Sequence, residues 1–362
     1  MLGEHPGKNQ QWIDFFKGIA ICGIVYTHAG GGGWIGTAGA YGVQMFFIIS
    51  LYLACHSLTG KSCETSLRYM TIIRWFLNRI WRLTPLYYIS LTAYIIMLPP
   101  GMNIWLGSSS AGVTWNNIVA HLLYIHNLFP YYANSIMWIE WYLGVLMLFY
   151  LILPVTLKCL RNLKAVVVFT FVTICLSIMI TGFLMKLHPL KDQYIWDGWV
   201  STYSMIRQFP VFSVALLLYW LERSFEKINL SYVFELAGCL CFIIAVVLYW
   251  IFNPHLLHVS LIAVISLSFG LILLGVIFSQ RESKSICILE PIEKILNMIG
   301  RHCYGIYLFH YLIILYLGKV IDNAEVKFGL TMFIAIVIAV CYDNTVGEKI
   351  NTWGRNKING DA

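Results

Sequence analysis

Residues 14–28 read DFFKGIAICGIVYTH, an apolar stretch with a lysine near its start and a histidine at its end. Lys17 and His28 are about three helical turns apart, so a helix projects both from nearly the same face. Their separation along the axis is about 16 Å, roughly half the hydrocarbon thickness of a bilayer. Ionisable side chains aligned inside a membrane helix usually mark a functional path, and histidine is the usual general base near neutral pH. The stretch therefore predicts a membrane helix that carries chemistry.

The composition is that of a membrane protein. Hydrophobic residues make up 59% of the chain, charged residues 11%, and the mean hydropathy is +0.73, whereas soluble domains carry about 25% charged residues. No polar stretch is long enough to fold separately. We therefore expect an all-α, polytopic membrane helical bundle with a single domain over residues 1–362. The ten cysteines form no CxxC pair; Cys239 and Cys241 lie closest, and all are interpreted as buried small hydrophobic residues.

About ten apolar segments are long enough to cross a bilayer. They lie near residues 13–29, 41–58, 83–99, 136–157, 164–186, 201–221, 231–252, 257–279, 301–318 and 327–346. A further apolar piece, residues 116–129, is too short to span and predicts a re-entrant or interfacial segment. Its histidines, His121 and His126, are expected to face solvent or the membrane interface.

The positive charges orient the chain. With the N-terminus inside, 19 of the 24 lysines and arginines lie on the cytoplasmic side. The others are Lys186, Lys191, Lys319 and Lys327 near the outer ends and Arg207 within a span. This asymmetry predicts cytoplasmic termini and explains the net charge of +7 without nucleic acid. A cleaved signal peptide ending near residues 37–40 is the alternative at the start of the chain, but charges inside its apolar run argue against it.

A basic motif, Arg79-Ile-Trp-Arg82, ends the loop before the third predicted span. The two arginines share a helix face, and their guanidinium forks suit phosphate oxygens. Two interpretations stay open: a site for the phosphates of a nucleotide-bearing cofactor, or an anchor to lipid headgroups.

Several polar residues in or beside the spans are further candidates. The glycines from Gly30 to Gly39 either allow a ligand to approach the backbone or form a flexible loop. Glu140, among aromatic residues at the outer end of a span, could bind sugar hydroxyls or orient a histidine. Arg207 is expected to pair with an acid such as Glu140 or Asp197, or to line a wet cavity.

A stripe of Tyr304, Tyr307 and His310 lies along one side of the helix expected near the C-terminus. It lines a cavity or forms a packing face whose polar tips are satisfied. No set of His, Cys, Asp and Glu has metal-ligand spacing, and no nucleophile elbow or nucleotide loop occurs, so we expect no metal site.

Five short motifs follow one another along the chain. They are Ile13-Asp14-Phe-Phe-Lys17-Gly18 through His28, Gly42-Val43-Gln-Met-Phe46-Phe47-Ile-Ile-Ser50, Arg79-Ile-Trp-Arg82 with Pro85, Glu140-Trp141-Tyr-Leu143-Gly144 with Phe149-Tyr150 and Pro154, and Tyr304-Gly-Ile-Tyr307-Leu308-Phe-His310. Together they resemble the acyltransferase 3 family of integral membrane O-acyltransferases. Two positions depart from its pattern: Lys17 replaces an arginine and loses the bidentate fork, and Leu51 replaces a glycine.

The resemblance implies an enzyme that moves an acyl group, most simply acetyl, from cytoplasmic acetyl-CoA to a hydroxyl of an extracytoplasmic or lipid-linked saccharide. His28 would act as the base or as an acyl relay, and Lys17 and Asp14 would assist catalysis. The resemblance assigns donor contacts to Arg79, Arg82, Lys17, Ser50, Tyr304, Tyr307 and His310, and acceptor contacts to Glu140, Trp141 and Arg207. The expected location is the cytoplasmic membrane of a bacterium. Some members carry an esterase-like domain; this sequence ends soon after its last predicted span, so none is expected.

Two other functions are compatible with the pattern. A transporter or flippase for a glycan or acyl intermediate would also need polar residues inside the membrane, but it offers no reason for a basic helix face beside Lys17 and His28. A purely structural membrane partner leaves the intramembrane polar residues unexplained.

Overall fold

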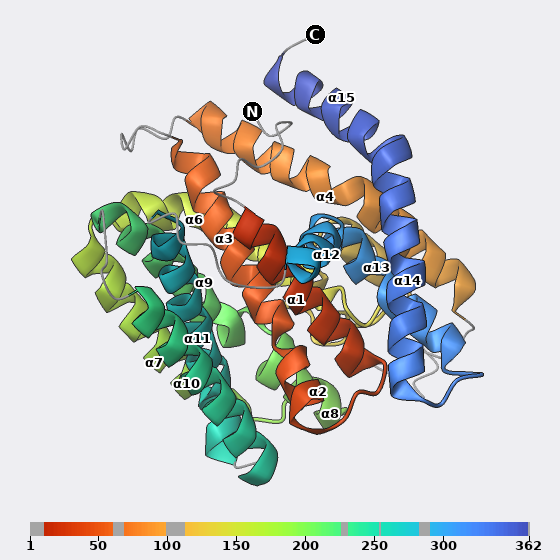
Figure 1. The fold of residues 1–362 in the computed structure, drawn as a ribbon, viewed down its shortest axis with the longest axis horizontal. Coiled ribbons are helices and arrows are strands. Elements are labelled where there is room, and N and C mark those ends of the chain that lie inside the picture. Colours follow the sequence, from red (N-terminus) through yellow and green to blue (C-terminus); the bar gives the residue numbers. More distant parts are fainter. Residues whose placement is uncertain are drawn as a thin grey trace.

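The structure is a computed structural model that describes residues 11–60, 69–98, 113–225, 231–252, 255–281 and 290–360 (Figure 1). These ranges are almost entirely helical and contain no strand, which confirms the all-α class. The first half holds α1 Gln11–His28, α2 Gly33–Ala40, α3 Gly42–Thr59, α4 Tyr69–Met97, α5 Trp115–Leu122, η2 His126–Leu128, α6 Trp141–Cys159 and α7 Leu163–Leu184. The second half holds α8 Gln193–Gly198, η3 Trp199–Tyr203, α9 Met205–Ser224, α10 Ser231–Phe252, α11 His255–Arg281, α12 Glu290–Arg301, α13 Cys303–Leu317, α14 Ala324–Tyr342, η4 Asp343–Gly347 and α15 Glu348–Asn359.

Every predicted span coincides with a helix, although the number of spans is approximate. Seven helices in the described ranges are long and apolar enough to cross a membrane. The other three segments, 13–29, 83–99 and 301–318, correspond to α1, α4 and α13. Helices α1 and α4 carry ionisable residues, and α13 has only 15 residues. The chain is thus a helical integral membrane protein in which the three least typical spans hold most of the candidate site residues.

Burial divides the helices into a core and a lipid-facing shell. Helices α3, α6, α9 and α11 are buried along most of their length, whereas α7, α10 and α14 mostly present exposed apolar side chains. Helix α1 lies at the centre and packs against α2, α3, α12, α13 and α14 (Figure 1). Because hydrocarbon tails solvate apolar side chains, the exposed faces of the shell are those expected to meet lipid.

Polar side chains cap the N-termini of several of these helices. Asn162, Ser204 and Asn323 stand at the N-caps of α7, α9 and α14, and each accepts a hydrogen bond from a backbone N–H in the first turn. Such caps satisfy amide groups that have no partner within the helix. The Ser204 cap also places Arg207 in the first turn of α9.

The amphipathic helix α12 crosses α1 at very close range. A Cβ atom on Gly300 would clash with the carbonyl oxygen of Asp14, and one on Gly18 would clash with that of Leu296. Glycine at both positions lets the two backbones touch. The crossing brings Arg301, at the end of α12, next to the start of α1.

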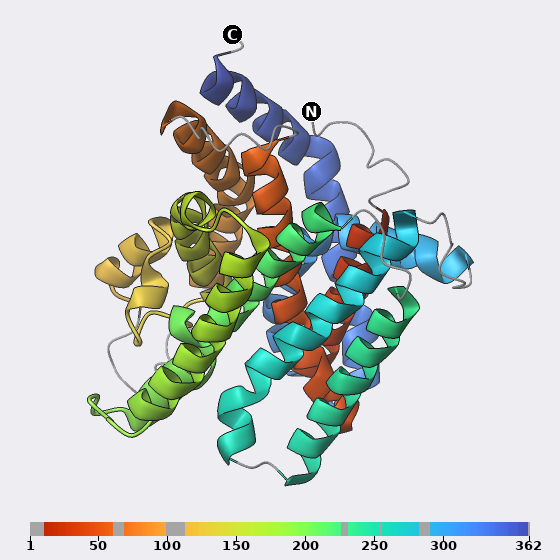
Figure 2. The ribbon, with the colours of Figure 1, turned by 90° about the vertical axis from the view of Figure 1, so that its left-hand side faces the viewer.

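Two histidines in the short segment between α4 and α6 differ from their prediction. Residues 116–129 form α5 and η2 at one side of the bundle (Figure 2). His121 and His126 are fully buried, so the expectation that they face solvent or the interface is wrong. They were misjudged because their buried partner, Glu140, is 14 or more residues away in sequence.

The prediction that all cysteines are buried is also wrong. Cys55 is buried, but Cys159, Cys239, Cys241 and Cys341 are exposed, and the cysteines in the described ranges are free thiols. A lipid-facing helix surface accepts this weakly polar side chain at little cost.

Candidate active site

His28 ends α1 and meets a second histidine. Its Nδ1 lies 2.8 Å from Nε2 of His310 on α13, and the two ring planes differ by only 10°. The edge of Tyr311 packs against the His28 ring, with centroids 5.5 Å apart. The His28 side chain is exposed whereas His310 is fully buried. No group in the described part of the chain hydrogen-bonds to His28 Nε2, so this nitrogen has no partner within the protein there.

The stripe on α13 is mostly a packing face. The Tyr307 hydroxyl donates to the carbonyl oxygen of Ile139 at 2.5 Å, and the Tyr304 hydroxyl donates to that of Leu83 at 2.8 Å. His310 Nδ1 lies 2.6 Å from the Tyr307 carbonyl oxygen. Of the two interpretations of the stripe, the satisfied packing face therefore describes the tyrosines, and His310 alone reaches the candidate catalytic residue.

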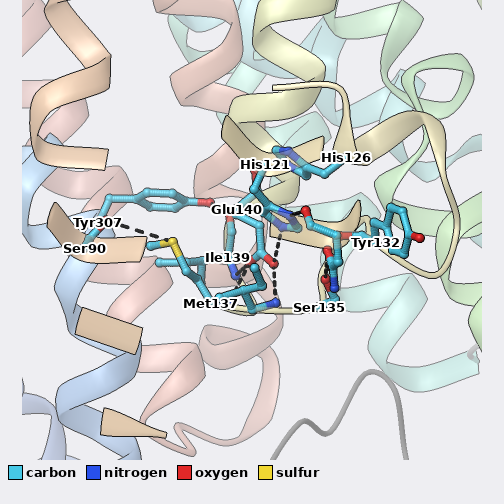
Figure 3. A network of polar contacts seen from close by, with 11 residues as sticks. Ser90, His121, His126, Tyr132, Ser135, Met137, Ile139, Glu140 and Tyr307 are labelled. Carbon is cyan, nitrogen blue, oxygen red and sulfur yellow. Dashed lines mark hydrogen bonds and ion pairs between the residues drawn. The ribbon is translucent and has the colours of Figure 1, made fainter. Parts of the chain in front are cut away.

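Glu140 is the centre of a buried hydrogen-bond network (Figure 3). Its Oε1 accepts from the backbone N–H of Ile136 at 2.8 Å and contacts His121 Nε2 at 3.3 Å. Its Oε2 accepts from the N–H groups of Met137 at 3.1 Å and Ile139 at 3.0 Å. Three backbone N–H groups thus donate to the Glu140 carboxylate, and Glu140 is fully buried. Glu140 orients a histidine, as one of the two interpretations expected, and anchors the loop of residues 136–140 that the sequence had assigned to a span.

This loop carries an aromatic side chain toward His28. Trp138 has a φ of 71°, a left-handed conformation that tryptophan rarely adopts. Its indole packs on Tyr311 with centroids 5.2 Å apart, and Tyr311 in turn packs on His28. The same loop supplies the carbonyl that holds Tyr307. Sequence reasoning missed Trp138 and Tyr311, because no local pattern shows that they meet.

A cluster of cations lies at the opposite end of α1. Lys17 is close enough to Arg79, Arg82 and Asp14 for electrostatic interaction, and Asp14 similarly faces Arg82 and Arg301. We call Lys17, Arg79, Arg82 and Arg301 the cation cluster. Within the described ranges, the side chains of Lys17 and Arg82 form no hydrogen bond or close ion pair with the protein. Lys17, Arg82 and Arg301 lie near the single carboxylate of Asp14, so the cluster has an excess of positive charge, which would suit an anionic ligand.

Arg79 is held in place without a carboxylate. Its Nη2 donates to Ser57 Oγ at 2.5 Å and to the Leu53 carbonyl oxygen at 3.3 Å. The guanidinium lies over the rings of Trp75 and Tyr150, 5.8 and 5.7 Å from their centroids. These contacts orient the arginine and leave its charge unneutralised.

The other predicted site residues have partners outside α1. Ser50 Oγ lies 3.2 Å from the Tyr142 hydroxyl. Trp141 and Arg207 are buried, and Arg207 Nε donates to the Ser201 carbonyl oxygen at 3.0 Å. Asp197, one expected partner of Arg207, lies 3.5 Å from His188.

The glycine-rich stretch packs helices together. Residues 33–40 form α2, and a Cβ on Gly39 would clash with the carbonyl oxygen of Gly23 on α1. Thr27 Oγ1 donates to the Gly36 carbonyl oxygen at 2.7 Å across the same contact. Residues 33–40 are therefore a packed helix and not a flexible loop.

The fold is thus a helical membrane protein whose central helix α1 ends at the paired His28 and carries Lys17 beside cations from α4 and α12. The chain belongs to the acyltransferase 3 family, because the family model, described as an acyltransferase domain, matches residues 10–342. In the described part of the chain no three His, Cys, Asp or Glu side chains could hold a metal ion together.

Similar proteins occur in Staphylococcus aureus. Those of strains COL, MSSA476 and MRSA252 each bear the name Putative O-acetyltransferase. Each is 24% identical to this chain over 324 aligned residues, which cover 83% of this chain and 50% of the relative. The chain therefore spans half the length of these relatives. No solved structure matches it significantly.

Proposed function

We propose that the protein is a membrane O-acyltransferase that moves an acetyl group from acetyl-CoA to a hydroxyl of a saccharide or lipid-linked saccharide. The observation that carries the proposal is the position of the His28 imidazole on the same helix as Lys17 of the cation cluster, about 16 Å away along the axis. Membership of the acyltransferase 3 family and the names of the relatives support acyl transfer to oxygen.

The cation cluster suits the donor. The pyrophosphate and 3′-phosphate of CoA would be bound by Arg79, Arg82 and Lys17, whose combined charge exceeds that of the nearby Asp14 carboxylate. The extended pantetheine arm would then run along α1 and bring the thioester to His28. Since most lysines and arginines of the chain are expected on the cytoplasmic side, the donor would enter from there.

The chemistry follows from the open nitrogen of His28. Nε2 takes the proton of the acceptor hydroxyl while the hydroxyl oxygen attacks the thioester carbonyl carbon. The C–O bond of the ester forms, the C–S bond breaks, and the proton passes from Nε2 to the departing sulfur of CoA. A relay in which Nε2 itself first takes the acetyl group uses the same nitrogen. Lys17 supplies positive charge where the CoA phosphates would bind, and the Asp14 carboxylate offsets part of the positive charge of the cluster.

The acceptor would approach His28 where the imidazole is exposed. Glu140, Trp141 and Arg207 are buried. In this proposal they do not touch the sugar, and they act by positioning the residues around His28. Glu140 does so by holding the loop that carries Trp138.

The test uses the purified protein in lipid vesicles, acetyl-CoA labelled in its acetyl group, and a bacterial glycolipid extract as acceptor. Free CoA and label on the extract are measured together, with empty vesicles as the control. We expect release of CoA that requires the extract and equals the label transferred. Absence of both release and acetyl-CoA binding would contradict the proposal and favour a transporter.

Replacement of Arg82 with alanine should weaken donor binding. Arg82 makes no hydrogen bond within the described ranges, so its removal costs the fold little while taking away one charged contact to a phosphate. We expect the dissociation constant for acetyl-CoA to rise about tenfold. Arg74→Ala is the matched control, because Arg74 is an exposed arginine on the same helix. An unchanged dissociation constant in Arg82→Ala would exclude the phosphate role.

A further inference from the structure

The contacts of His310 determine which of its nitrogens carries hydrogen. Its Nδ1 lies 2.6 Å from the carbonyl oxygen of Tyr307. A carbonyl oxygen only accepts, so Nδ1 must be the donor. The carbonyl is fixed by the helix itself, and the Tyr307 side chain is anchored separately on Ile139.

The other nitrogen of His310 then faces His28. The His310 ring is fully buried among Tyr307, Tyr311 and His28, and no carboxylate of the described ranges forms an ion pair with it. A charged imidazolium there would lose its hydration without gaining a counter-ion, so the neutral ring is favoured. A neutral His310 with hydrogen on Nδ1 has a lone pair on Nε2. Since Nε2 lies 2.8 Å from His28 Nδ1, the hydrogen between them belongs to His28.

We propose that His310 is a positioning residue that holds His28 as the tautomer protonated on Nδ1, leaving Nε2 as the free nitrogen for acyl transfer. The second histidine acts as an acceptor for the first, and a backbone carbonyl fixes the direction of both hydrogen bonds. The role deepens the proposed function and rests on it. When His28 takes a proton on Nε2, its Nδ1–H becomes a stronger donor to His310, so the contact stabilises the charged intermediate.

The nearly parallel rings support this arrangement. Planes only 10° apart with a nitrogen–nitrogen distance of 2.8 Å let the Nδ1–H of His28 point along the lone pair of His310, which lies in its ring plane. Tyr311 packs edge-on against His28, with planes 81° apart, and limits rotation of the ring. The exposed edge of His28 is therefore held facing outward.

The first test is nitrogen NMR of the full-length protein in lipid, labelled with ¹⁵N-histidine, at a pH where imidazoles are neutral. The His28 signals are identified by subtracting the spectrum of His28→Gln. We expect Nδ1 of His28 to carry hydrogen and Nε2 to be bare. Hydrogen on Nε2 would overturn the proposal. Because this readout needs no turnover, it separates a failure of the inference from a failure of the proposed acyl transfer.

The second test compares two variants of His310. In His310→Gln the amide oxygen can still accept from His28 Nδ1, whereas His310→Leu removes the acceptor. We expect His310→Leu to lower kcat about 10- to 100-fold with little change in KM for acetyl-CoA, the loss typical of one hydrogen bond to a charged group. His310→Gln should recover most of that loss and keep the Nδ1–H signal of His28. The exposed His188→Gln serves as the control.

Two kinetic results would overturn the proposal. One is an unchanged kcat in His310→Leu. The other is an equal loss of kcat in both variants with the Nδ1–H signal of His28 preserved in both. If His310→Leu fails to fold, the spectrum of His310→Gln still tests the proposal. Loss of the His28 Nδ1–H signal in His310→Gln would contradict the acceptor role.

Discussion

Replacement of His28 with alanine is expected to lower acetyl transfer about 10²- to 10⁴-fold, the range usual for loss of a general base. His28 supplies an open nitrogen at the reactive end of α1, and in the described part of the chain His310 is the only group hydrogen-bonded to it. If His28 instead relays the acetyl group, the loss should be at least as large. The measurement is label transfer with simultaneous CoA release in vesicles.

Stability should change little in His28→Ala. The side chain is exposed, so truncation leaves no large buried cavity, and the lost hydrogen bond to His310 is worth about 1 kcal/mol. Thermal unfolding in detergent and binding of acetyl-CoA should stay close to wild type. His188→Ala is the matched control because it removes an exposed histidine elsewhere. Full activity in His28→Ala would exclude His28 as base and as relay.

Glu140→Gln is expected to destabilise the fold by about 1–3 kcal/mol, although it changes only one atom of the side chain. Glu140 Oε1 accepts from the N–H of Ile136, and Oε2 accepts from the N–H groups of Met137 and Ile139. In either orientation of glutamine, the amide NH₂ faces at least one of these backbone donors and cannot accept from it. Buried donors without a partner each cost about 1–3 kcal/mol. A large drop in the midpoint of thermal unfolding is the expected measurement.

The same substitution should also reduce transfer, because the loop released by Glu140 carries Trp138 and the carbonyl of Ile139. The matched control is Glu290→Gln, an exposed glutamate whose partner Lys294 lies 2.6 Å away and lowers the pKa of the carboxyl group. An exposed pair of this kind contributes little to stability. If both variants unfold at the wild-type temperature, Glu140 does not anchor the loop.

The all-α class and the place of the central helix could be predicted from the sequence. Inside a membrane, backbone N–H and C=O groups must be hydrogen-bonded within the segment itself, so a long hydrophobic stretch of sequence predicts a helix. For the same reason, all ten predicted segments coincide with helices. The alignment of Lys17 with His28 was equally readable, since it depends only on helical periodicity.

Contacts between distant segments could not be predicted. His121 and Glu140 are 19 residues apart, and His28 and His310 are 282 apart. His121 and His126 were therefore expected at the interface, and the sequence could not choose between a sugar and a histidine as the partner of Glu140. The packing of the helices determines which partners a buried polar group finds, and a local sequence pattern does not predict that packing.

Hydropathy and helical period are local properties, so the sequence alone predicts a helical membrane protein with a basic residue and a histidine on one face of its first helix. Which polar groups meet depends on the tertiary structure. It pairs His28 with His310, brings Arg79 and Arg82 near Lys17 and Arg301 near Asp14, and buries Glu140 under the loop that it anchors. Hydrogen bonds and charge interactions depend on distances of a few ångströms between helices, and the packing of the whole bundle sets those distances.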